Sequence, residues 1–333
     1  MKKWYLIKKG NNGATYIFNT KDISSMIYSL KYYKTFTFRQ YLVKTFLFSN
    51  LIITKYFASS KLIDVVSVKE YLKKNTLESI DFDIDEDSSI LISPTKDKII
   101  VHKHNESSFI KYAFGQSLDG VKNESNIYKL FDKQKNFNTS IISEFYSDKE
   151  YCKFKLQNKT FYKKNDDLVE ILSEFFLIKN ETISTSEYFD KYFPNISDQL
   201  KTILSNIIEN LKDKDINIGL THKDFKPWNI DMLRGPLIYD FEETCLAFPT
   251  EDLINYYIDP IISYASVEDI IGLLNSENLN TQINKYKTIL NIDLKNKFLI
   301  SQYLLERVYF WENKNKKEIS NKYFEILKAY INE

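Results

Sequence analysis

Residues 222–242 read HKDFKPWNIDMLRGPLIYDFE, and this stretch decides the fold. It combines the spacing H-x-D-x-x-x-x-N with an apolar-Asp-aromatic triplet centred on Asp240. Asp224 can meet an acceptor hydroxyl, while Asn229 and Asp240 carry the hard oxygen ligands that Mg²⁺ prefers. On a short loop followed by a tight hairpin, this combination is typical of sites that transfer a phosphoryl group.

The block HKDFKPWN resembles the catalytic loop of the aminoglycoside phosphotransferase and choline kinase superfamily. It is most similar to the H-x-D-F-x-P-W-N form of phosphotransferases associated with bacterial surface polysaccharides. The resemblance implies an α+β, bilobal protein-kinase-like fold, with a small β-rich N-lobe, a helical C-lobe and here a basic N-terminal extension. It also implies ATP and Mg²⁺ as cofactors.

Upstream of the loop, short alternating apolar runs predict three strands, at Ile90–Ile92, Ile99–His102 and Phe109–Ala113. By resemblance, Lys111 on the third strand takes the place of the lysine that binds the α- and β-phosphates of ATP. Glu124 follows on a helical pattern and is expected to pair with Lys111. Glu106 is another acid in the same region and stays open as an alternative partner.

Five residues of the loop and hairpin have expected roles. Asp224 is the predicted base, which orients the acceptor hydroxyl and takes its proton. Asn229 and Asp240 are the predicted Mg²⁺ ligands. His222 and Lys226 complete the catalytic group: His222 is expected to hydrogen-bond the loop backbone, and Lys226 either reaches the γ-phosphate or is a solvated lysine.

The sequence departs from the kinase pattern at three places. No glycine-rich loop is present, so the amides of the turn at 93–97 and the hydroxyls of Ser93 and Thr95 are expected to hold phosphate. After Asp240 the triplet reads DFE rather than DFG. Asp252 follows so closely that a long activation segment does not fit, which argues against a regulated protein kinase. Asp252 is expected to accept hydrogen bonds from catalytic-loop amides.

Three regions are expected: a basic N-terminal extension or subdomain at 1–80, an N-lobe at 81–158 and a C-lobe at 159–333 that holds the catalytic loop 222–229. The N-lobe is predicted to end in two strands and a hinge, at Ser140–Tyr146, Tyr151–Gln157 and 157–159. The C-lobe is predicted to contain helices at Asp166–Ile178, Ser197–Asp213, Glu251–Tyr257, Lys295–Trp311 and Glu318–Ile331. The catalytic hairpin is predicted to pair Ile230–Leu233 with Leu237–Tyr239.

Residues 1–63 carry eleven basic side chains and one acid, Asp22, for a net charge of +10 in a chain of net charge +1. Within them, Arg39–Phe57 has a helical and unusually apolar pattern. Such a segment either packs on the N-lobe with solvated lysines or contacts an anionic membrane or acidic glycan, and the two are compatible. Nucleic-acid binding is not expected, because no binding motif accompanies the charge.

The residues themselves predict a kinase that transfers a phosphoryl group to an alcohol, and the resemblance implies that the acceptor is a sugar hydroxyl of a surface glycan such as lipopolysaccharide or capsule. A small-molecule kinase of the aminoglycoside or choline type is the alternative, and four acids could line its acceptor pocket: Glu242, Glu243, Glu251 and Asp259. A membrane-docked pseudokinase is a third possibility, but the complete set of five site residues argues against it.

The amino-acid composition indicates the general class of the protein. A hydrophobic content of 43% is that of a folded globular protein. Only three of the 46 basic residues are arginine, which we attribute to an overall bias of composition. The sequence has neither a secretion signal nor an apolar run long enough to span a bilayer, and its two cysteines form no metal or disulfide pattern. A cytoplasmic protein is expected, with peripheral contact at the inner membrane face as an open alternative.

Overall fold

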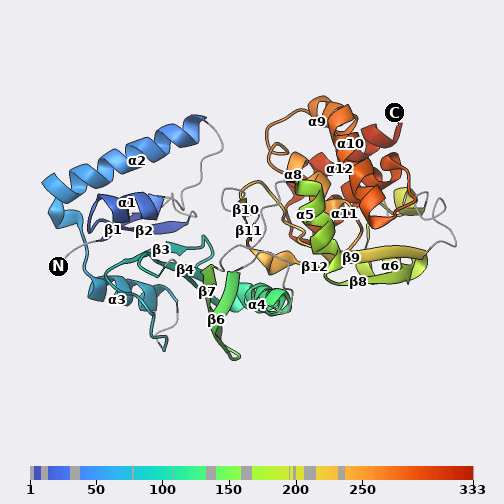
Figure 1. Cartoon of the computed structure of the whole chain (residues 1–333). Coiled ribbons are helices and arrows are strands. Elements are labelled where there is room, and N and C mark those ends of the chain that lie inside the picture. Colours follow the sequence, from blue (N-terminus) through green and yellow to red (C-terminus); the bar gives the residue numbers. More distant parts are fainter. Residues whose placement is uncertain are drawn as a thin grey trace. The chain divides into compact units, whose positions relative to one another are not determined.

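The computed structural model describes residues 4–8, 14–30, 38–76, 79–106, 108–132, 140–158, 167–194, 196–197, 200–205, 215–231 and 237–332. The chain forms two compact units, Met1–Lys135 with Thr139–Thr160, and Asn136–Asn138 with Phe161–Glu333. The first unit is built on an antiparallel sheet and the second is mainly helical (Figure 1). The α+β class predicted from the sequence is therefore confirmed.

The sheet of the N-terminal unit has seven strands in the order β1-β2-β3-β4-β5-β7-β6. They are β1 (Trp4–Lys8), β2 (Thr15–Asn19), β3 (Ser88–Ile92), β4 (Lys98–Lys103), β5 (Ser108–Phe114), β6 (Ser140–Ser147) and β7 (Tyr151–Asn158). The five strands predicted from the sequence correspond to β3 through β7. Residues before 81 add β1 and β2 to the same sheet, so the division predicted near residue 80 falls inside one compact unit.

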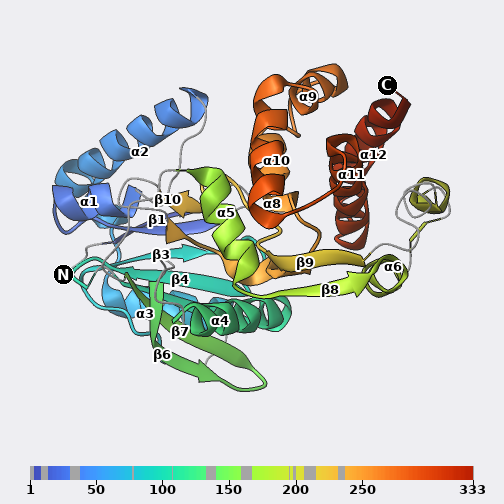
Figure 2. The same cartoon turned by 45° about the vertical axis from the view of Figure 1, so that its right-hand side comes forward.

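Helices pack on both faces of this sheet because alternate side chains of a strand point to opposite faces. On β2, Ile17 joins a buried cluster with Val68, whereas the next residue, Phe18, joins one with Met26 and Leu51. Helix α3 therefore covers one face, and α1 and α2 cover the other, with α1 next to β2 (Figures 1 and 2). Their bounds are α1 (Ile23–Leu30), α2 (Phe38–Phe57) and α3 (Val65–Asn75).

Helix α4 (Leu118–Asp132) packs against β5, β6 and β7. On β5, Ile110 and Tyr112 belong to the buried cluster on the α3 side, so Lys111 between them points to the opposite face. Glu124 lies on the buried face of α4 together with Phe131. The alternation of β5 and the periodicity of α4 thus direct these two charged side chains toward each other.

The C-terminal unit consists of helices around a three-stranded sheet of order β12-β9-β8 and a small hairpin of β10 and β11. The helices are α5 (Leu168–Leu177), α6 (Thr185–Tyr192), α8 (Glu251–Ile258), α9 (Val267–Leu274), α10 (Glu277–Leu290), α11 (Asn296–Asn313) and α12 (Lys317–Asn332). The strands are β8 (Asn180–Ser184), β9 (Asp215–Thr221), β10 (Ile230–Asp231), β11 (Leu237–Ile238) and β12 (Cys245–Ala247). In Figure 2, α11 and α12 run side by side, as their contacts require.

Four predicted helices correspond to α5, α8, α11 and α12, and the predicted hairpin corresponds to β10 and β11. Of the helix predicted at Ser197–Asp213, residues 200–205 are helical and 206–214 lie outside the described residues, as do the hairpin turn at 232–236 and Lys159 of the predicted hinge. Helices α6, α9 and α10 were not predicted. None of the helices in the described ranges is long and apolar enough to cross a membrane.

Candidate active site

Strand β9 leads into the loop at 222–229 and is held between β8 and β12. Gly219 on β9 faces the ring of Phe176 on α5, and a Cβ at this position would lie 2.5 Å from the ring atom Cδ1. The close approach of α5 to β9 therefore requires glycine here. Because the strand is clamped on both edges and against α5, the residues that follow it start from a fixed position.

The carboxylate of Asp252, at the start of α8, fixes the backbone of the loop. It accepts hydrogen bonds from the amides of His222 (2.7 Å to Oδ2) and Lys223 (3.0 Å to Oδ1). This contact was expected from the sequence and is confirmed. Lys223 has a left-handed backbone conformation, with φ of +66°, which costs free energy and must be held by the surrounding structure. The two hydrogen bonds to Asp252 hold it.

Asp224 and Asn229 lie next to each other in the loop. The side-chain amide Nδ2 of Asn229 donates to the backbone carbonyl of Asp224 at 2.8 Å and to its carboxylate oxygen Oδ2 at 3.3 Å. The side chain of Asp224 is 29% exposed, so its carboxylate can be reached by a substrate. Because Nδ2 of Asn229 is the donor, its carbonyl oxygen Oδ1 is the atom left to bind a cation.

His222 connects the loop to the hairpin. Its ring nitrogen Nε2 lies 2.7 Å from the carbonyl of Tyr239, to which it donates, and the amide of Tyr239 donates to the carbonyl of Asn229 at 2.8 Å. His222 is fully buried between the rings of Phe225 and Phe241. Burial and the hydrogen bond to the backbone fit the packing role expected for it, rather than contact with a substrate.

The hairpin brings the second predicted Mg²⁺ ligand to the loop. Ile230 pairs with Ile238, and the hydrogen bond between residues 239 and 229 extends this pairing by one step. Asp240 follows directly, in a left-handed conformation with φ of 69° and ψ of 56°. Asp240 thus directly follows the residue that hydrogen-bonds to Asn229, so both residues lie at the same end of the hairpin. Two oxygen-bearing side chains at one end of a hairpin suit a hard cation such as Mg²⁺.

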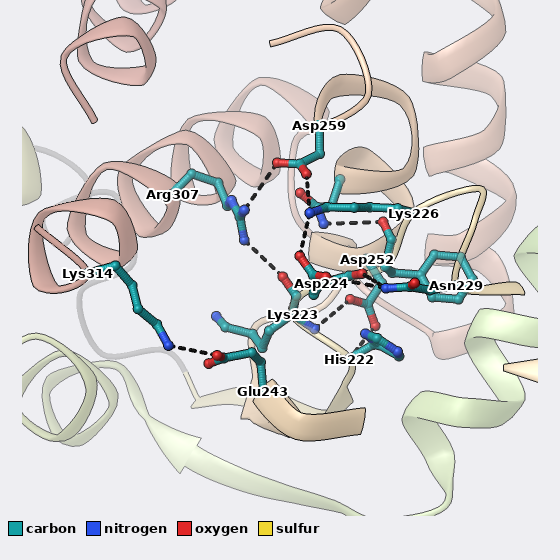
Figure 3. A network of polar contacts seen from close by, with 12 residues as sticks. His222, Lys223, Asp224, Lys226, Asn229, Glu243, Asp252, Asp259, Arg307 and Lys314 are labelled. Carbon is teal, nitrogen blue, oxygen red and sulfur yellow. Dashed lines mark hydrogen bonds and ion pairs between the residues drawn. The ribbon is translucent and has the colours of Figure 1, made fainter. Parts of the chain in front are cut away.

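Lys226 bridges two carboxylates. Its Nζ lies 2.6 Å from Oδ1 of Asp224 and 2.7 Å from Oδ2 of Asp259, and its side chain is 14% exposed (Figure 3). Burial lowers the pKa of Lys226, but the charges of Asp259 and Asp224 outweigh burial and raise that pKa above its ordinary value. Lys226 is therefore a paired ammonium ion beside the predicted base and not a solvated lysine.

Arg307 of α11 contacts both the loop backbone and Asp259, and this role was not predicted from the sequence. Its guanidinium donates to the carbonyl of Lys223 at 2.9 Å and pairs with Oδ1 of Asp259 at 3.3 Å (Figure 3). The side chain is fully buried, and the rings of Phe310, Trp311 and Tyr323 surround the guanidinium. One arginine thus holds both the loop backbone and the acid that positions Lys226.

A second buried ion cluster lies beneath the loop. Nζ of Lys223 contacts Oε2 of Glu251 at 2.6 Å and Oε2 of Glu306 at 2.9 Å, and Tyr188 donates to Glu306. Burial opposes ionisation of Glu306, but the Lys223 ammonium and the hydrogen-bond donors around it outweigh burial and hold its pKa below the usual range. Burial raises the pKa of Glu251 well above its usual value, with the charge of Glu306 adding to the effect.

These contacts correct the acidic acceptor pocket predicted from the sequence. Glu251 is 2% exposed and belongs to the buried cluster, and Asp259 is paired with Lys226 and Arg307. The sequence prediction failed because the basic partners of both acids were not recognised. Glu243 forms an exposed ion pair with Lys314 at 2.7 Å.

In the N-terminal unit, Lys111 and Glu124 form the predicted pair. Nζ of Lys111 lies 2.6 Å from Oε2 of Glu124, and the two side chains are 9% and 0% exposed. Glu106, the alternative partner, instead lies 2.6 Å from Nζ of Lys155. The pairing of Lys111 with Glu124 is therefore confirmed as geometry, while its role in phosphate binding remains a prediction.

The turn between β3 and β4 departs from the expected phosphate cradle. The hydroxyls of Ser93 (3.0 Å) and Thr95 both donate to Oδ1 of Asp97. Burial raises the pKa of Asp97, but these hydrogen bonds outweigh it and lower the pKa below its ordinary value. Both hydroxyls donate to a carboxylate, and the amides of Ser93 and Lys96 donate to the carbonyls of Lys98 and Ser93, so the turn does not present the phosphate cradle expected from the sequence.

Comparison with known proteins gives structural similarity only. No family model matches the chain, and no curated protein matches it. Solved structures with a similar chain path include a thermostable mutant of aminoglycoside phosphotransferase APH(4)-Ia with ADP and hygromycin B, at a TM-score of 0.48 and 9% identity over 80% of this chain and 98% of that one.

Two further similar structures are complexes of related enzymes. One is aminoglycoside phosphotransferase APH(3'')-Id from Streptomyces rimosus with ADP and streptomycin (TM-score 0.41, 10% identity, 62% of this chain and 88% of that one). The other is the complex of gentamicin with APH(2")-IIa (TM-score 0.37, 13% identity, 80% and 96%). With TM-scores below 0.5, these similarities assign neither a family nor an activity to this chain.

Proposed function

We propose that this protein is an ATP- and Mg²⁺-dependent phosphotransferase that phosphorylates a hydroxyl group of a small molecule. The observation that carries the proposal is the geometry of the loop at 222–229. Asp252 fixes its amides, Asn229 holds Asp224, and the Asp224 carboxylate stays partly exposed. A positioned carboxylate of this kind can orient a hydroxyl and accept its proton.

In the proposed reaction, the hydroxyl oxygen of the acceptor forms a bond to the γ-phosphorus of ATP while the bond to the β-γ bridging oxygen breaks. ADP leaves, and Asp224 receives the proton of the hydroxyl. Asn229 and Asp240 are the proposed ligands of Mg²⁺, which neutralises charge on the phosphates when bound. Lys111, held by Glu124, is proposed to contact the α- and β-phosphates. Lys226 provides a positive charge beside the base.

The connection after Asp240 supports a small acceptor rather than a protein. A single 3-10 turn, Phe241–Glu243, and the short strand β12 lead directly to α8. Helix α8, which follows this short segment, contributes Asp252, so the loop is fixed without a separate activation segment. A sugar hydroxyl of a surface glycan remains a second candidate acceptor, because the H-x-D-F-x-P-W-N form of the loop favours it.

The proposal is tested with purified full-length protein, ATP and Mg²⁺ against a panel of aminoglycosides, choline, free sugars and lipopolysaccharide fragments. Acceptor-dependent ADP release, together with a phosphorylated product in mass spectrometry, is the expected result. The size of the accepted molecule then decides between the two acceptor classes. Nucleotide binding without transfer to any acceptor would instead support the pseudokinase alternative.

Replacing Asp240 with asparagine is expected to weaken the dependence of activity on Mg²⁺. The substitution removes one anionic ligand, so the Mg²⁺ concentration for half-maximal activity should rise by about tenfold or more and the maximal rate should fall. A Mg²⁺ titration of ATP turnover measures both. A titration curve that coincides with that of the unaltered protein would remove Asp240 from the proposed ligands.

Replacing Lys111 with methionine is expected to lower kcat/KM for ATP by about 10- to 100-fold, since a charge-assisted contact contributes roughly 1.5–3 kcal/mol. Lys155→Met is the matched control, because Lys155 forms a similar pair with Glu106 on the same sheet. Nucleotide affinity measured by calorimetry should fall only for Lys111→Met. An equal loss in both variants would indicate damage to the sheet rather than loss of a phosphate contact.

A further inference from the structure

Helix α2 carries a row of large apolar side chains on its outer face, which we call the outer stripe. It consists of Leu42, Phe46, Ile53, Tyr56 and Phe57. Their spacings of three, four and seven residues place them on one side of the helix. They are between 51% and 85% exposed, with Phe57 the most exposed. Five large apolar side chains in one row are more than the scattered exposed residues of an ordinary surface.

The inner face of the same helix packs against the core of the N-terminal unit. Leu51 is fully buried against Phe18 of β2 and Met26 of α1, with Leu47 and Phe48 packed on this cluster. The helix is therefore apolar on both sides, and only its inner side contributes to the core. A second apolar face of this size calls for a second apolar partner, and within the described residues nothing covers the outer stripe.

The charge of this part of the chain indicates what the stripe contacts. Residues 1–63 have a net charge of +10, while the remaining residues sum to −9. Helix α2 itself contains Arg39, Lys44 and Lys55 and no acidic residue. Apolar side chains that insert at the headgroup level, on a segment of net positive charge, are a combination by which helices bind anionic lipid surfaces.

We propose that α2 lies along the surface of a bilayer that contains anionic lipids, with the outer stripe at the boundary of headgroups and acyl chains. The helix lies on the membrane and does not cross it, consistent with its polar and basic residues. A second copy of the chain is a poorer occupant, because two segments of charge +10 would repel each other. Nucleic acid would match the charge but not the aliphatic side chains of the stripe.

Flotation with lipid vesicles tests the proposal on the full-length protein. Vesicles with roughly one-third phosphatidylglycerol in phosphatidylcholine should bind the protein, whereas vesicles of phosphatidylcholine alone should bind it at least about tenfold less. Raising the salt to about 1 M, where the screening length is about 3 Å, should release most of it. Equal binding to both vesicle types, or no binding to either, would overturn the proposal.

Two matched triple variants test whether vesicle binding depends on the outer stripe or on exposed apolar side chains in general. Phe46→Ser, Ile53→Ser and Phe57→Ser together should lower the partition coefficient by about tenfold or more, since they remove the inserted side chains. The control replaces three exposed apolar residues of the C-terminal unit with serine, namely Leu177, Tyr264 and Ile289. Circular dichroism and the melting temperature should be unchanged in the stripe variant, because its altered side chains lie outside the core.

Contact of the outer stripe with a second copy of the chain or with nucleic acid would give different results in these experiments. If the stripe variant and the control bind vesicles equally, the stripe does not contact lipid and the proposal fails. Light scattering after size exclusion shows whether a dimer exists and dissolves in the stripe variant, which would assign the stripe to a second copy instead. A shift of a labelled oligonucleotide that is lost in the same variant would assign it to nucleic acid.

Discussion

Replacing Asp224 with asparagine is expected to reduce the rate of phosphoryl transfer by a factor of about 10² to 10⁴, the range that a positioned base contributes. The amide has nearly the same shape but cannot accept the proton of the acceptor hydroxyl. ATP affinity should stay within about threefold, because the nucleotide contacts proposed for Lys111 are unchanged. Single-turnover transfer and equilibrium nucleotide binding measure the two effects separately.

Glu181→Gln is the control for this experiment. Glu181 is an exposed carboxylate of the same unit, paired at 3.5 Å with Lys191, and neutralising it should leave transfer unchanged. Transfer by the Asp224 variant at the rate of the control would remove Asp224 as the base. Because Asp224 is partly exposed, its replacement should also leave the melting temperature within a few degrees of the original.

Replacing Arg307 with alanine is expected to lower the free energy of unfolding by about 3–5 kcal/mol, the usual cost of removing one partner from a buried ion pair. The substitution removes a fully buried side chain that pairs with Asp259 and donates to the carbonyl of Lys223. The proposed transfer rate should fall as well, because Asp259 then holds Lys226 less firmly beside Asp224. Urea denaturation and steady-state kinetics test the two consequences.

Lys314→Ala supplies a matched comparison on the same stretch of chain. Lys314 pairs with Glu243, and the two side chains are 46% and 39% exposed. An exposed pair contributes about 0–1 kcal/mol, so this variant should be nearly as stable as the unaltered protein.

Arg307→Lys keeps the charge but loses the forked geometry, and it should recover only part of the stability. A loss below about 1 kcal/mol in Arg307→Ala would contradict the supporting role.

The parts of the fold that the sequence predicted are those with a local pattern. Strands β3 to β7 were found within two residues, because each is a short alternating run bounded by turn residues. The pairing of Lys111 with Glu124 followed from the family resemblance, together with the predicted strand and helix that carry the two residues, and is confirmed by the structure. The contact of Asp252 with the loop amides followed from the family resemblance and is confirmed by the structure.

Strands β1 and β2 were not predicted because both of their faces are covered. On β1, Trp4 packs toward α3 and the next residue, Tyr5, packs toward α1 and α2. A strand buried on both sides shows no alternation of apolar and polar residues, so its period of two cannot be seen. Helix α10 was missed for a different reason: its buried residues do recur at helical spacing, as Leu279, Ile283, Tyr286 and Leu290, and this signal was overlooked.

The support beneath the loop could not be predicted, because it joins residues distant in sequence. Lys223 and Glu306 are 83 residues apart, and no local pattern links them. The scarcity of arginine was attributed to composition, yet Arg307 occupies a place where a lysine cannot reach both a carbonyl and a carboxylate with fixed geometry. In a chain that otherwise uses lysine, each arginine is therefore a position to examine first.

The strand order of the N-terminal sheet has a consequence for biosynthesis. Its strands follow the chain almost in order, so the sheet can grow strand by strand while the polypeptide emerges from the ribosome. The loop at 222–229 cannot mature in this way, because Glu306 and Arg307 are translated some 80 residues later. A nascent chain that stops before α11 would carry a folded first unit, but its Asp224 would lack the support of Glu306 and Arg307. The loop at 222–229 therefore reaches its final conformation only near the end of translation.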